Sequence, residues 1–195
     1  KGFPAVQRPA SCWIVTPLAG SAPSTAVAPT NLTAGALAGE PLLRDPLVAH
    51  RILRVVGRAA MPGRFLICDR LSHQGGLSGT VTTAQTTNLP TAALTRYTSG
   101  EGVIAGLEIY TGVGATVSSA TASYTNQAGT AGQTTIATTF GGGNFNVANR
   151  IIPLPLAAGD TGVRAVASVT VPATTGTAGN FGVTLFKPLM SFTVQ

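Results

Sequence analysis

The chain has 195 residues, of which 44% are hydrophobic and only 9% are charged, and its formal net charge is +6. This length can bury a core without disulfides or metal ions, and the abundance of Thr, Ala, Gly and Val favours a β-protein over a helical bundle. No apolar stretch approaches the ~18 residues of a membrane-spanning helix, and neither a Lys/Arg run nor aromatic enrichment accompanies the basic balance to indicate nucleic-acid binding.

The charged residues are few and unevenly placed. Residues 1–70 hold eight of the twelve basic residues. A surface with so few charges is poorly suited to a free soluble monomer, so we expect neighbouring subunits to cover part of it. We interpret the scattered arginines as partners for salt bridges to those subunits.

Residues 1–46 are predicted to form an extended N-terminal arm. They contain seven prolines, which remove backbone donors and disfavour a helix or a central strand. Apolar residues lie between the prolines, so the arm is expected to pack against a partner. The candidate partner-binding residues in this arm are Trp13, Ile14 and Leu18.

One short helix is predicted at the start of the second unit, residues 47–195. Asp45 is a suitable N-cap, and Pro46 fits the first helical position. At 100° per residue the apolar residues that follow share one arc, and three arginines share an adjacent one. We interpret these as a partner-facing stripe, which comprises Arg51, Arg54 and Arg58.

From residue 64 the hydrophobic pattern changes to a period of two, which predicts strands. The clearest case is 163–171, where Val163, Ala165, Ala167, Val169 and Val171 would share one face. The segments 120–125 and 181–186 alternate in the same way. Further predicted strands are Phe65–Asp69, Gly79–Thr83, Ile104–Tyr110, Ile136–Phe140 and Ser191–Val194. Many short strands with glycine-rich turns indicate a mainly β fold, a β-sandwich with jelly-roll-like character.

A short internal repeat accompanies these strands. Gly129-Thr130-Ala131-Gly132 recurs as Gly176-Thr177-Ala178-Gly179. Each copy reads as a strand, a turn and a second strand, which predicts two similar hairpins. Chance recurrence of small residues in a chain rich in Gly, Thr and Ala is the alternative.

The segment Cys68–Gly76 places Asp69, Ser72 and His73 close together in sequence. A nucleophile, a base and a carboxylate must converge in space, whereas neighbours on an extended strand point to opposite faces. We therefore interpret the segment as a strand end that runs into a glycine-rich loop, and we predict no catalytic residues.

No metal or cofactor site is predicted either. The two histidines, His50 and His73, have no ligand-like spacing, and Cys12 and Cys68 lie outside any metal-binding pattern. Gly141-Gly142-Gly143-Asn144 lacks the lysine of a phosphate-binding loop and predicts a turn. We expect both cysteines to be unpaired, because their contexts show no disulfide framework and a protein assembled in a cytoplasm keeps its thiols reduced.

Three stretches resemble virion structural proteins encoded by tailed bacteriophages and prophages. They are Cys68–Thr86, then Arg96–Gly100 with Leu107–Tyr110, and finally Thr174–Thr184. The resemblance covers roughly residues 64–190. It implies a component of the phage particle with no enzymatic residues.

These observations together predict a non-enzymatic virion structural protein, with a capsid decoration (cement) protein as the preferred function. Its expected partners are the major capsid protein and copies of itself, with no small-molecule substrate, nucleic acid or membrane. The alternatives are a tail or head–tail connector component and a carbohydrate-binding adhesin module. The adhesin would need exposed Trp or Tyr platforms, and the chain has one Trp and three Tyr.

Overall fold

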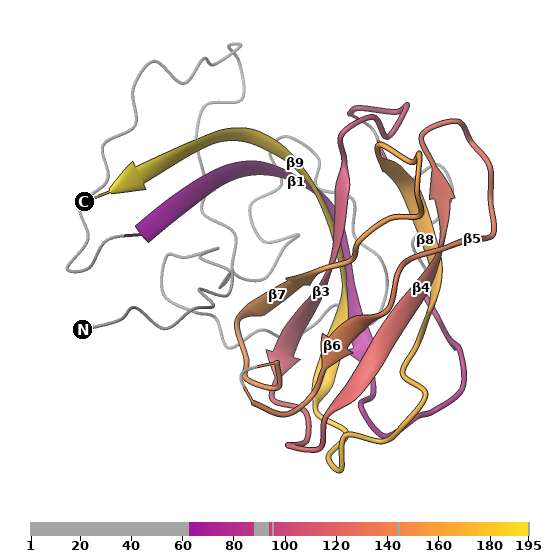
Figure 1. Ribbon diagram of the computed structural model, residues 1–195, viewed down its shortest axis with the longest axis vertical. Helices are drawn as coiled ribbons and strands as arrows, with labels where there is room; N and C mark the ends of the chain where they lie inside the picture. Colours follow the sequence, from indigo (N-terminus) through magenta and orange to yellow (C-terminus); the bar gives the residue numbers. More distant parts are fainter. Residues whose placement is uncertain (1–62, 88–93, 95, 144, 195) are drawn as a thin grey trace.

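The structure, a computed structural model, describes residues 63–87, 94, 96–143 and 145–194. These residues form a mainly β fold of antiparallel strands, with no helix among them (Figure 1). The strands in chain order are β1 (Gly63–Leu77), β2 (Gln85–Thr86), β3 (Ile104–Thr111), β4 (Ser118–Asn126), β5 (Gln133–Thr134), β6 (Thr138–Phe140), β7 (Arg150–Pro153), β8 (Val163–Thr170) and β9 (Asn180–Val194).

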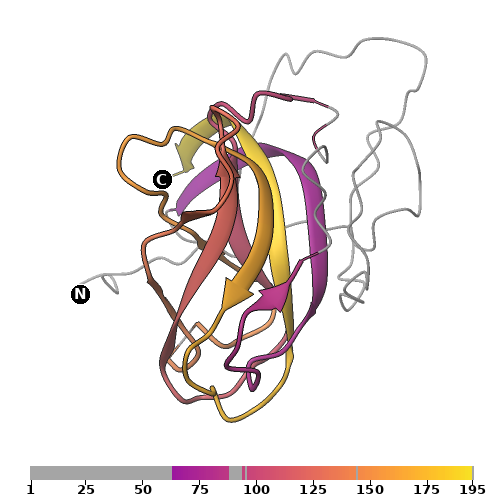
Figure 2. The same ribbon diagram turned by 90° about the vertical axis from the view of Figure 1, so that its right-hand side faces the viewer.

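The strands form two sheets that lie face to face (Figure 2). One has the order β1-β9-β3-β7, and the other has the order β2-β8-β4-β5, with β6 also paired to β4. The pairing is nested along the chain, because β1 pairs with β9, β2 with β8, and β3 with β7, while β4 pairs with β5 and β6. The described chain therefore behaves as one long hairpin whose successive pairs alternate between the two sheets.

The core lies between the sheets and follows the alternation within each strand. The four-stranded sheet contributes fully buried side chains of β3 and β9, which are Ala105, Leu107, Ile109, Phe181, Val183 and Leu185. The facing sheet contributes Ala120, Ala122, Tyr124, Val163, Val166 and Val169. Phe140 of β6 packs on Phe181, with ring centroids 4.6 Å apart. The alternation predicted for 120–125 is confirmed by the burial of β4.

The strand predicted at 163–171 is present, but its face is interrupted. Ser123 of β4 lies opposite Ser168 and Tyr124 lies opposite Val166, so Ala167 is bulged out of the ladder. As a result Ala167 is exposed and Val166 is buried, which contradicts the predicted face at these two positions. Composition alone cannot locate such a bulge, because Ala and Val suit either face.

Two further sequence predictions are wrong. Gly79–Thr83 is a turn rather than a strand, because the Gly79 N–H donates to Ala178 O (2.7 Å) and its carbonyl accepts from Thr175 N (2.8 Å). The segment Cys68–Gly76 is not a strand end that runs into a loop, since β1 continues to Leu77 with register shifts that absorb the irregular residues. The predicted strand Ile104–Tyr110 is confirmed by β3.

The repeated turns share a backbone feature but not a hairpin. Gly129, Gly132, Gly176 and Gly179 all have positive φ, a conformation that glycine adopts without strain. The first turn connects β4 to β5 within one sheet, whereas the second connects β8 to β9 in different sheets. The prediction of two similar hairpins is therefore wrong, although the turn motif has a physical basis.

The first and last strands extend beyond the rest of their sheet (Figure 1). The β3 ladder on β9 ends where Ile104 pairs with Phe186, whereas β1 and β9 remain paired to Gly63 and Val194. We call Gly63–Asp69 and Lys187–Val194 the ribbon. In the part of the chain that the structure describes, no third strand supports it.

Candidate functional site

A cluster of polar side chains lies on the face of the four-stranded sheet that points away from the core. Arg70 comes from β1, Thr184 from β9, and Glu108 and Tyr110 from β3. Register brings them together, because Arg70 pairs with Phe186 and Glu108 with Gly182 on either side of Thr184. Arg70, Glu108 and Thr184 are all buried.

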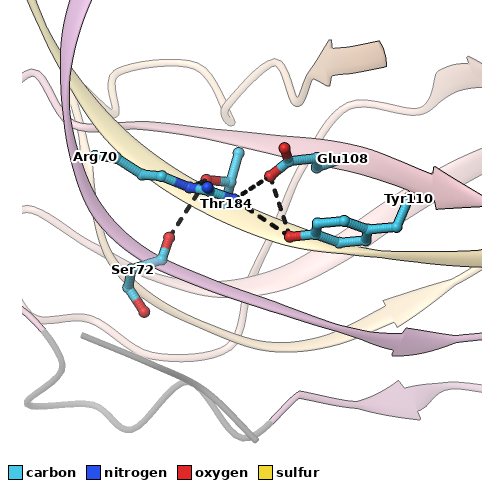
Figure 3. A network of polar contacts seen from close by, with 5 residues as sticks. All are labelled: Arg70, Ser72, Glu108, Tyr110 and Thr184. Atoms are coloured by element: carbon cyan, nitrogen blue, oxygen red, sulfur yellow. Dashed lines mark hydrogen bonds and ion pairs between the residues drawn. The ribbon is translucent and has the colours of Figure 1, made fainter. Parts of the chain in front are cut away.

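These residues form one connected network (Figure 3). The Arg70 guanidinium forms an ion pair with the Glu108 carboxylate and donates from Nε to Thr184 Oγ1 (3.2 Å). The Tyr110 hydroxyl donates to Glu108 Oε2 (3.1 Å) and accepts from Arg70 Nη2 (3.3 Å). Thr184 Oγ1 donates in turn to the Ser72 carbonyl (3.4 Å). The network therefore links three neighbouring strands, and within it the buried charges of Arg70 and Glu108 offset one another.

The environment of Tyr110 makes its phenol a proton donor rather than a base. Burial and the neighbouring Glu108 carboxylate raise the pKa of Tyr110 well above its usual range, partly opposed by Arg70. The hydroxyl thus stays protonated and continues to donate to Glu108. This arrangement suits a structural tie between strands.

Ser72 and His73 are buried beside this network but do not form a catalytic site with Asp69. Ser72 pairs with Leu185 and His73 with Thr184, so successive side chains point to opposite faces of the sheet. Asp69 accepts hydrogen bonds from Arg96 Nε (2.9 Å) and Nη2 (2.6 Å). Among the described residues, Ser72 Oγ and His73 Nδ1 have no hydrogen-bond partner.

The burial of His73 determines its protonation state. Desolvation, together with the nearby Arg70 charge, lowers the pKa of His73 to about 3. The imidazole is therefore neutral over the physiological range. A general base needs a pKa near the working pH and a group that orients its ring, and neither condition is met by the residues described around His73.

A second set of contacts holds the base of the ribbon against the loop before β3. Asp69, on β1, forms its bidentate pair with Arg96. Lys187, its partner across the ribbon, donates to the Glu101 carbonyl (2.6 Å) and lies 5.6 Å from the centre of the Tyr97 ring. The ribbon thus leaves the sandwich in a fixed direction.

Asp160, in the loop between β7 and β8, joins this loop to the end of β4. Its carboxylate accepts hydrogen bonds from the Tyr124 hydroxyl and from Asn126 Nδ2 (2.7 Å). The Ala157 N–H donates to the same hydroxyl (2.9 Å). Burial and the hydrogen bond to Asp160 raise the pKa of Tyr124. This cluster fixes the loop against β4.

Cys68 is a half-buried free thiol, and burial raises its pKa to about 11. It is therefore a poor nucleophile at neutral pH, as thiolate is the reactive form. In residues 63–87, 94, 96–143 and 145–194, no group of three His, Cys, Asp or Glu side chains could hold a metal ion. Gly141, Gly142 and Gly143 have positive φ and form a turn after β6, as predicted.

The residues predicted to bind a partner, Trp13, Ile14, Leu18, Arg51, Arg54 and Arg58, lie outside the described residues. So do Cys12, His50, the N-terminal arm 1–46 and the helix predicted after it. The Arg70–Glu108 network was missed at the sequence level. A lone acid between Leu107 and Ile109 signals a buried carboxylate that needs a cationic partner, but only the sheet register identifies Arg70.

Comparison with protein-family models, with curated proteins and with solved structures finds no match for this chain. Within the described residues, no helix is long and apolar enough to cross a membrane.

Proposed function

We propose that this chain is a non-enzymatic structural protein of a tailed-bacteriophage particle, and that it decorates and stabilises the capsid shell. We assign the two-sheet fold as a jelly roll, and a jelly roll would suit this role. Nested pairing of β1 with β9, β2 with β8 and β3 with β7, divided between two sheets, supports this assignment, because a jelly roll is also built from two antiparallel sheets. Jelly rolls recur in viral capsid proteins and in lectins. The fold therefore limits the candidate functions but does not by itself select one of them.

The ribbon is the observation that carries the proposal. It contributes little to the sandwich core, and it exposes Leu66 (51%), Leu189 (50%) and Met190 (44%) to solvent. Two strands alone are marginally stable in water, so a rigidly held ribbon with exposed apolar side chains is best suited to contact another subunit. A shell-stabilising protein needs such a projecting contact in addition to a rigid module.

The polar groups favour a structural role over the alternatives. The charged side chains are used internally, because the buried Arg70 pairs with Glu108 and the partly exposed Asp69 pairs with Arg96. An adhesin would need an aromatic ring face open to a sugar. Tyr97 is the exposed aromatic residue of the described chain, and the Lys187 ammonium lies over its ring.

The N-terminal arm completes the proposal as an adhesive segment. Residues 1–46 would lie across the major capsid protein and bury Trp13, Ile14 and Leu18, and the Arg51, Arg54 and Arg58 stripe would face the same partner. Burial of apolar surface contributes roughly 25 cal/mol per Å², and the prolines reduce the entropy lost when the arm becomes ordered.

The test is an electron-microscopy map of the intact particle of the phage that encodes this chain. Density for the nine-stranded module distributed over the head shell would support decoration. A ring of modules at the tail or at the head–tail junction would overturn decoration in favour of a tail or connector component. A particle without the module would overturn the virion role altogether.

A further inference from the structure

In the described chain neither long edge of the ribbon has a neighbouring strand, and the β1 edge is the better candidate for pairing because β9 carries Pro188, which has no N–H to donate. β1 is the edge strand of its sheet, and in the part of the chain that the structure describes, no strand pairs with its outer side. Along Gly63–Asp69, alternate residues therefore direct backbone N–H and C=O groups away from β9. Unpaired strand edges of this kind form hydrogen bonds with strands of other chains.

The distribution of charge indicates what kind of chain can approach this edge. The whole chain carries a net charge of +6, so two copies repel one another overall. Within the ribbon, Pro188–Val194 has no charged residue, and the charged residues at the other positions are Arg64, Asp69 and Lys187. Two ribbons therefore meet with few like charges between them, so charge repulsion opposes self-contact there only weakly.

The geometry of the edge is also self-complementary. Two identical strands that pair antiparallel are related by a two-fold axis, so the same residues serve on both sides of the contact. A second copy supplies an edge of the same length and twist. It also brings a second Leu66, whose exposed side chain lies on the paired segment.

We propose that Gly63–Asp69 of β1 pairs antiparallel with the same segment of a second copy of this chain, about a two-fold axis at the ribbon. This inference rests on the assembly role proposed above and names both the partner and the edge. The Asp69–Arg96 pair and the Lys187–Glu101 contact hold the ribbon at its base, so the edge is presented before the copies meet. The contact is small, and interfaces below about 1,200 Å² are typically weak, so the dimer forms in a concentration-dependent manner.

Sedimentation of the full chain over a range of concentrations tests the proposal. Leu66→Lys places like charges close to the two-fold axis and should raise the dimer dissociation constant by about tenfold or more. Val117→Lys is the matched control, because it adds the same charge at a more exposed position (64%) outside the ribbon. Its dissociation constant should stay within about twofold of the unmodified chain. Equal unfolding midpoints for all three proteins would show that the variants are folded.

Amide hydrogen exchange provides a second measurement. Amides in Gly63–Asp69 should become more protected as the protein concentration rises, while those of β4 should not change. A chain that stays monomeric, or equal weakening by Leu66→Lys and Val117→Lys, would overturn the proposal. So would protection of β1 that appears only with capsid protein present. The particle map reports the virion role independently, so failure of the dimer and failure of the proposed function are distinguishable.

Discussion

The two faces of the four-stranded sheet are both buried but are stabilised by different forces. Leu107 and Glu108 are neighbours on β3, with exposed fractions of 0% and 3%, and they point to opposite faces. Leu107 belongs to the apolar core between the sheets, whereas Glu108 is held by Arg70 and Tyr110. The stability of the core face depends on the shape and volume of its side chains, whereas that of the outer face depends on charge balance. Substitutions at equally buried positions should therefore have different effects on the two faces.

The largest effect is expected on the charged face. Glu108→Leu removes the carboxylate from a buried guanidinium, and breaking one half of a buried ion pair typically costs about 3–5 kcal/mol. The double substitution Arg70→Met/Glu108→Leu should recover most of this loss, because it removes both charges at similar volume. Urea denaturation of the two variants measures the difference. A single variant as stable as the double variant would show that the ion pair does not hold this face.

The apolar face should respond to volume instead. Leu107→Ala leaves a cavity in the core and should destabilise the fold by about 2–5 kcal/mol. Leu107→Met conserves volume and should cost less than about 1.5 kcal/mol. The same denaturation experiment applies, and a Met variant as unstable as the Ala variant would contradict a core packed by shape.

Acid should weaken the polar face through His73. The unfolded imidazole titrates near 6.5, whereas the pKa of His73 in the folded protein is about 3. Between these values the unfolded chain binds more protons, so stability rises with pH through this window and is fully present above 6.5. The slope approaches about 1.4 kcal/mol per pH unit. His73→Phe should flatten the profile of unfolding free energy against pH between pH 4 and 6.5, relative to the unmodified chain. Carboxylates elsewhere contribute equally to the two proteins, so the difference reports His73. Parallel profiles for the two proteins would contradict a buried neutral imidazole.

The contrast between the faces also explains what sequence could predict. Alternation is enough to identify β3, β4 and the inner residues of β9, because apolar residues that recur at a period of two indicate one buried face of a strand. The same alternation places Thr184 and Phe186 of β9 on the face away from the core, yet both are buried. Burial of a second face depends on what packs there, which the pattern of one strand does not contain.

The errors in the strand predictions have the same physical origin. Gly79–Thr83 contains β-formers, but its backbone bonds go to Thr175 and Ala178, far away in sequence. The bulge at Ala167 depends on its pairing with β4. The Arg70–Glu108 pair depends on a register that brings β1, β9 and β3 side by side. In each case the determinant is a long-range contact, whereas the repeated glycine turns, which are local, were recognisable.

The smallest effect is expected where the sheet gives way to the ribbon, because the pair there is partly exposed to solvent. The side chains of Asp69 and Arg96 are 24% and 27% exposed, and such a pair contributes at most about 1 kcal/mol to global stability. Asp69→Asn should therefore scarcely alter the unfolding midpoint. Its effect should appear locally, because loss of the bidentate contact releases the ribbon from the loop. Amide exchange in Gly63–Cys68 should then be faster by about fivefold, the equivalent of about 1 kcal/mol.

Glu101→Gln is the matched control, because the ribbon contact uses the Glu101 carbonyl, which the substitution retains. Faster exchange in both variants would mean that general loosening of the loop, and not the Asp69–Arg96 pair, governs the ribbon; unchanged exchange in Asp69→Asn would mean that β1–β9 pairing alone holds it in place.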